Sequence, residues 1–145
     1  MSDMSDYLEN KLIDHIFRNR SYTVPATIFV GLYTAAPSDA GGGTEVTGGS
    51  YVRVQVGPSD TDWDATQGGT PAAASSGTGG ATANAAAITF PAPSANWGVI
   101  THMGIFDASS AGNLLFWKAL TTPKTVNNGD PAPSFATGAL DVVLA

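Results

Sequence analysis

The chain has 145 residues, of which 43% are hydrophobic and only 12% are charged, and its net charge is −6 at pH 7. This length and composition favour a folded domain with a real core and exclude a disordered protein. Only six Lys and Arg residues are present. We therefore expect no nucleic-acid partner, because binding to a phosphate backbone needs clustered positive charge.

The chain contains no cysteine, which excludes disulfide bonds, thiolate metal sites and cysteine nucleophiles. Its first residues are polar and acidic, unlike a signal peptide. No stretch approaches the roughly 20 apolar residues of a membrane span. We expect a soluble protein that has no membrane partner and is assembled in a reducing cytoplasm.

One amphipathic helix is predicted near the start of the chain, over residues 6–19. Leu8, Leu12 and Ile16 recur at four-residue spacing, which places them on one helix face. This apolar face would pack either on the rest of the domain or on a partner. We favour packing on the domain.

The remaining chain, residues 26–145, is predicted to form an antiparallel β-sandwich. Short apolar or β-branched runs alternate with Gly- and Pro-rich turns, a pattern typical of sandwiches and barrels. A long Gly/Ala-rich loop is expected over residues 66–83. We predict a single domain, 1–145. The expected strands cover residues 27–34, 51–56, 85–90, 99–107, 113–120, 134–136 and 140–144.

The densest group of carboxylates is formed by Asp60, Asp62 and Asp64. Alternating Asp residues open calcium loops of the EF-hand type, which also need a Gly after the third Asp and a terminal Glu. Ala65 and Pro71 stand at those two positions. We expect a solvated loop and no metal site, although cation binding stays open.

Catalytic patterns are missing from the sequence. His102 and Asp107 are near each other, but no nucleophile-elbow sequence accompanies them. His15 is isolated on the predicted helix, and no phosphate-binding motif occurs. We predict that the protein is not an enzyme and has no catalytic, metal or cofactor-binding residues.

Several segments of the chain resemble a family of small tailed-phage virion proteins. They are residues 7–12 (YLENKL), 26–34 (ATIFVGLYT), 45–53 (EVTGGSYVR) and 97–107 (WGVITHMGIFD), which continues into 112–117 (GNLLFW). Members of this family are often described as tail fibre proteins. The size and all-β character also resemble the jelly-roll cement or decoration proteins of capsids, so the expected fold is jelly-roll-like.

The resemblance implies a structural role in a virion. We predict a capsid cement protein on the outer surface of a phage head, where it stabilises contacts between major capsid protein subunits as a homo-oligomer, a dimer or a trimer. Low charge and abundant small residues suit such extended contact. The alternative is a tail fibre or baseplate module that recognises a host receptor. Copy number per particle distinguishes the two.

Contacts with partners are expected on edges and loops. The two arginines suit bidentate contacts to carboxylates, and aromatic residues often anchor interfaces. The tryptophans also suit core packing, and both interpretations stay open for them. The predicted interface residues are Tyr7, Asn10, Arg18, Arg20, Trp63 and Trp97.

Overall fold

The computed structural model describes residues 3–65, 74–75 and 79–144. Within these residues, one helix, α1, and ten strands follow one another. The elements are β1 (Asp3–Met4), α1 (Asp6–Phe17), β2 (Phe29–Ala35), β3 (Thr44–Glu45), β4 (Val54–Gln55), β5 (Ala81–Ala83), β6 (Ile88–Thr89), β7 (Gly98–Phe106), β8 (Leu114–Val126), β9 (Ser134–Phe135) and β10 (Asp141–Val143).

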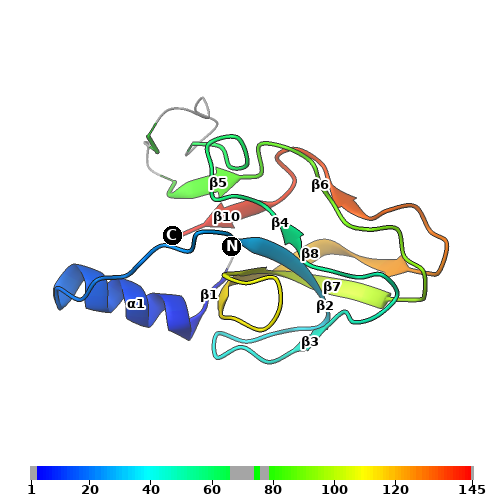
Figure 1. Cartoon of the computed structure of the whole chain (residues 1–145), viewed down its shortest axis with the longest axis horizontal. Coiled ribbons are helices and arrows are strands. Elements are labelled where there is room, and N and C mark those ends of the chain that lie inside the picture. The colour runs from blue at the N-terminus through cyan, green and yellow to red at the C-terminus, as the bar shows by residue number, and fades with distance from the viewer. Residues whose placement is uncertain (1–2, 66–73, 76–78, 145) are drawn as a thin grey trace.

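The main sheet has the strand order β1-β8-β7-β2-β3, and β4 also pairs with β2. Two small antiparallel pairs, β10–β5 and β6–β9, lie over one face of it (Figure 1). All pairings are antiparallel. The predicted antiparallel sandwich with one N-terminal helix is therefore confirmed.

The hydrophobic core fills the space between the main sheet and the small strand pairs. Alternate residues of the sheet point into it, among them Val30 and Ile105, which are at most 3% exposed. From the other layer, Phe90, Leu140 and Val142 close the core. Burial of these side chains is the main favourable contribution to folding.

The long strand β8 contains a proline, Pro123, at a shift in its register with β7, where the pairing passes from Lys124 opposite Ile100 to Ala119 opposite His102. At Phe116 and Trp117, β8 also pairs with β1 on its other side. No second strand is paired with β8 at Pro123 among the described residues, so this part of the strand is an edge. An edge position tolerates proline, because the missing N–H would otherwise be needed by a neighbouring strand.

The helix ends two residues earlier than predicted. Arg18 leaves the helical conformation with φ −118° and ψ 7°, although its N–H still donates to the Asp14 carbonyl. Asn19 then adopts a φ of 52°, which reverses the chain direction. The apolar spacing did not reveal this end, because Ile16 and Phe17 continue the periodic pattern up to it.

Two β predictions also need correction. The predicted strand 51–56 is reduced to Val54–Gln55, because β4 pairs with β2 only at Phe29 and Val30, and beyond them this edge of β2 pairs with β3. In the predicted loop 66–83, Ala81–Ala83 form β5, because their backbone pairs with β10. Residues 66–73 and 76–78 of that loop lie outside the described residues. Among the described residues, no helix is long and apolar enough to cross a membrane.

Candidate functional site

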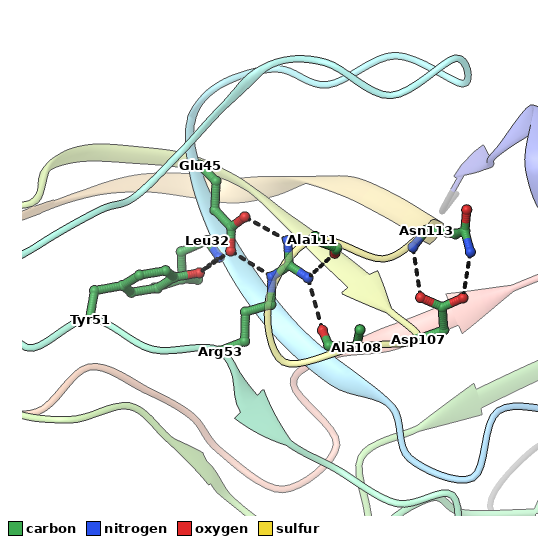
Figure 2. Close-up of polar contacts among 8 residues, drawn as sticks. All are labelled: Leu32, Glu45, Tyr51, Arg53, Asp107, Ala108, Ala111 and Asn113. Carbon is green, nitrogen blue, oxygen red and sulfur yellow. Dashed lines mark hydrogen bonds and ion pairs between the residues drawn. The ribbon is translucent and has the colours of Figure 1, made fainter.

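Arg53 is the centre of a polar cluster that joins the strand β3 to the β7–β8 hairpin (Figure 2). Its Nε and Nη2 donate to the two carboxylate oxygens of Glu45 at 2.8 and 2.7 Å. Its Nη1 donates to the carbonyl oxygens of Ala108 and Ala111, both at 2.8 Å. The Arg53 side chain is only 7% exposed, so this bidentate pair is largely shielded from water.

The hydroxyl of Tyr51 extends the cluster to the neighbouring strand β2 (Figure 2). It accepts the Leu32 N–H at 2.8 Å and donates to Glu45 Oε1 at 2.9 Å. Burial raises the pKa of Tyr51 far above its ordinary value, so the hydroxyl keeps its proton. A protonated hydroxyl is what the bond to the Glu45 carboxylate requires.

A second polar contact closes the β7–β8 hairpin. The Asp107 carboxylate accepts the backbone N–H of Asn113 at 2.6 Å and its side-chain amide at 2.7 Å. Gly112, with a φ of 69°, supplies the left-handed residue that the turn needs. Arg53 and Asp107 therefore hold the same loop from two directions.

The hydrogen bonds of this cluster serve a structural role. The Arg53 guanidinium uses four of its five N–H donors, and both Glu45 oxygens accept hydrogen bonds. The guanidinium also lies 3.3 Å from the ring centroid of Phe106. Because these groups bond to one another, the arrangement fixes the loops in place.

A hollow of about 350 Å³ lies beside the cluster, between the start of α1, the loop that follows β2 and the β7–β8 hairpin. Tyr33 forms part of its wall, and burial raises the pKa of this tyrosine to about 12. Asp39 lines it too and accepts the indole N–H of Trp117 at 3.0 Å. Asp6 adds a second carboxylate to its wall, and Arg53 lines it from the side of the cluster.

The residues considered for catalysis are not brought together as a catalytic group. The Asp107 carboxylate is bonded to Asn113, and His102 Nδ1 lies 2.8 Å from the Thr101 hydroxyl. His15 is exposed on α1, where its Nδ1 lies 3.3 Å from the Tyr22 backbone nitrogen.

The acidic loop around Trp63 is held by its own contacts. The Ser59 hydroxyl donates to Asp62, and the Trp63 indole N–H donates to the Val56 carbonyl at 2.9 Å. In the described part of the chain, no three His, Cys, Asp or Glu residues are placed to hold a metal ion.

The predicted interface residues lie in different environments. Asn10, Arg18 and Arg20 are exposed on or just after α1, and Tyr7 and Trp63 are partly buried. Trp97 is only 5% exposed, and its indole N–H donates to the Gly49 carbonyl at 2.8 Å. The structure thus places Trp97 in the core.

The helix buries less of its apolar face than the sequence led us to expect. Leu8 is its one buried residue, and Leu12 is partly buried. Ile13, Ile16 and Phe17 are 50%, 65% and 79% exposed. The spacing identified the stripe correctly, but it could not show that the helix extends past the edge of the sandwich (Figure 1).

A comparison with known families gave a match over most of the chain. A family model described as Podophage GP4 fiber I protein gp80 matches residues 3–143. The match includes α1 and every strand of both layers. The comparison with curated proteins found no match.

Proposed function

The chain belongs to the Podophage GP4 fiber I protein gp80 family, a family of phage virion structural proteins, and from this membership we propose that it is a component of a phage tail fibre. The resemblance to phage virion proteins that the sequence indicated is therefore confirmed at this level. The match over residues 3–143 carries the proposal, because it covers the whole fold and not one motif.

The polar groups of the structure support a non-enzymatic role. In the Arg53 cluster, the charged groups bond to each other and to loop carbonyls. Such a cluster stabilises one arrangement of loops but leaves no base or nucleophile free to act. We propose that the protein works by holding a defined shape and by contacting other virion proteins.

The capsid cement role stays a prediction. It rests on the resemblance to jelly-roll cement proteins and on low charge and small side chains, which suit many kinds of protein contact. The family description names a fibre, and this favours the tail over the head. We accordingly propose other tail proteins as partners, in place of the major capsid protein.

Gold-labelled antibodies against the purified chain test the proposal on intact virions. We expect gold particles at the tail, while antibodies against the major capsid protein label the head of the same particles. Label distributed over the head would overturn the fibre proposal and support the cement prediction.

A further inference from the structure

The N-terminal helix and the segment after it form a projecting arm, which we define as residues 6–24. At its base, the buried Ser5 donates its hydroxyl to the Leu114 carbonyl at 2.5 Å and its backbone N–H to the Leu115 carbonyl at 3.0 Å. Beyond this base, the helix extends past the sheet, and the chain returns alongside it (Figure 1). The contact between His15 and the Tyr22 N–H ties the two parts together.

The end of the arm carries apolar side chains that the described chain leaves in water. Ile13, Ile16 and Phe17 stand at three- and four-residue spacing, so they share one helix face. Val24, on the returning segment, is 72% exposed. A group of exposed large apolar side chains on a projecting element is typical of an interaction surface.

A hollow on the body of the same chain has the size and chemistry to receive this surface. It measures about 200 Å³, and its walls are formed by Trp63, Phe116, Val142 and other apolar side chains, together with Thr82. The hydroxyl of Thr82 is already bonded to the Asp64 carbonyl. An apolar cavity of roughly 150 Å³ binds benzene, so this hollow, which we call the Trp63 hollow, has room for a phenyl ring.

The charges around the two surfaces are complementary. Arg18 and Arg20 lie within three residues of Phe17 at the end of the arm, and Arg18 pairs with Asp14. Next to the Trp63 hollow lies a second hollow, which shares Trp63 and is lined by Asp60 and Asp64. The ion pairs of the described residues do not include Arg20, so its charge is available to a partner.

The arm of one molecule does not fill its own Trp63 hollow. Phe17 is 79% exposed, and the base of the arm is fixed to β8 through Ser5. A second copy of the chain supplies both surfaces in the required combination, because every copy carries one arm and one hollow. Such a contact is heterologous, and it closes into a ring or continues as a filament.

We propose that the arm of one copy docks in the Trp63 hollow of the next copy, with Phe17 in the apolar hollow and Arg20 facing the Asp60–Asp64 loop. This inference rests on the proposed structural role and names the surface through which copies associate. It adds a function to the acidic loop and to two residues that the sequence indicated as contact residues, Trp63 and Arg20.

Sedimentation velocity of the purified full-length chain tests the proposal. We expect wild-type protein to associate as its concentration rises, and the variant Phe17→Asp to lose at least about 30-fold in association constant, as for an interface hot spot. The matched control is Val52→Asp, which alters another exposed apolar side chain, 58% exposed, outside the arm. A wild-type chain that stays monomeric, or a Phe17→Asp variant that associates normally, would overturn the proposal.

Mixing two defective variants tests the head-to-tail arrangement. The Phe17→Asp variant keeps an intact hollow. The Thr82→Trp variant, whose new side chain fills the hollow, keeps an intact arm. Each variant alone should stay monomeric, whereas their mixture should form a one-to-one complex. If Thr82→Trp shows a changed circular dichroism spectrum, the exposed Asp60→Lys replaces it as the hollow variant. A mixture that stays monomeric would overturn the docking of the arm in this hollow. These results are independent of the gold labelling, so a failure of the fibre location and a failure of this contact are distinguishable.

Discussion

Gly31 of β2 lies directly opposite Gly104 of β7, and this glycine pair makes room for the ring of Phe106. A Cβ atom on Gly31 would lie 2.9 Å from the ring atom Cε2, and one on Gly104 would lie 3.1 Å from it. The same ring lies under Arg53. Two residues without side chains therefore determine where the ring and the guanidinium can lie.

Gly104→Ala should destabilise the fold through overpacking. The new methyl group would lie 2.9 Å from side-chain atoms of Tyr33 and Leu114, both of which are buried. We expect a loss of about 1–3 kcal/mol in the free energy of unfolding, measured by urea denaturation. In a double-mutant cycle, Gly104→Ala should cost less in the Phe106→Leu background than in the wild type, because the ring atom 3.1 Å from the new methyl group is removed. A stability equal to wild type in the single variant would contradict the packing described here.

Arg53→Ala should be more damaging than the loss of any exposed charge. It removes the two bonds from Arg53 to the Glu45 carboxylate, which keeps the bond from the Tyr51 hydroxyl, and the two bonds to loop carbonyls. Breaking a buried pair costs about 3–5 kcal/mol. Glu45 is a quarter exposed, so we expect a value near the lower end. The matched control is Arg18→Ala, whose exposed pair with Asp14 should contribute at most about 0.5 kcal/mol. Equal losses in the two variants, measured by urea denaturation, would refute the structural role of Arg53.

Tyr33 makes the fold sensitive to alkaline pH. Burial raises its pKa from 10.0 to about 12, so the folded chain holds the proton more tightly than the unfolded chain. This contribution to stability is complete below pH 10 and is lost as the pH rises towards 12. Tyr33→Phe should lose less stability than wild type across this window, in urea denaturation at a series of pH values. Identical slopes for the two proteins would exclude Tyr33 as a cause.

Asp141 makes a small contribution to stability with the opposite pH dependence. The hydrogen bond from Lys118 lowers the pKa of this carboxyl below 3.8, so the pair adds stability at neutral pH that disappears as the pH falls through the lowered value. Because the Asp141 side chain is 48% exposed, Asp141→Asn should cost only about 0.2–1 kcal/mol at neutral pH. The difference from wild type should vanish in acid. A difference that persists there would show that the amide acts through packing and not through charge.

Local patterns predicted the strongest elements of this fold. β7 and β8 were recognisable because β-branched and apolar residues run through them on both sides of the turn at residues 107–113. β5 was not recognisable, because Ala-Thr-Ala has no apolar periodicity and becomes a strand only through its long-range pairing with β10.

The site depends still more on contacts between distant parts of the chain. The bond from Arg53 to Ala111 joins residues 58 positions apart, and no spacing rule indicates it. The helix of the arm was predicted, but the exposure of the arm follows from where Ser5 fixes its base on β8. Composition therefore indicated that the protein has a contact surface, and the tertiary structure identifies which apolar residues are exposed.

The ratio of this chain to the major capsid protein, measured by quantitative mass spectrometry of purified virions, tests the central claim most directly. A fibre component occupies only the tail, whereas a cement protein covers the whole head. We predict that the chain is present at a small fraction of the amount of the capsid protein. A ratio close to that of the capsid protein itself would contradict the fibre assignment and place the chain on the head.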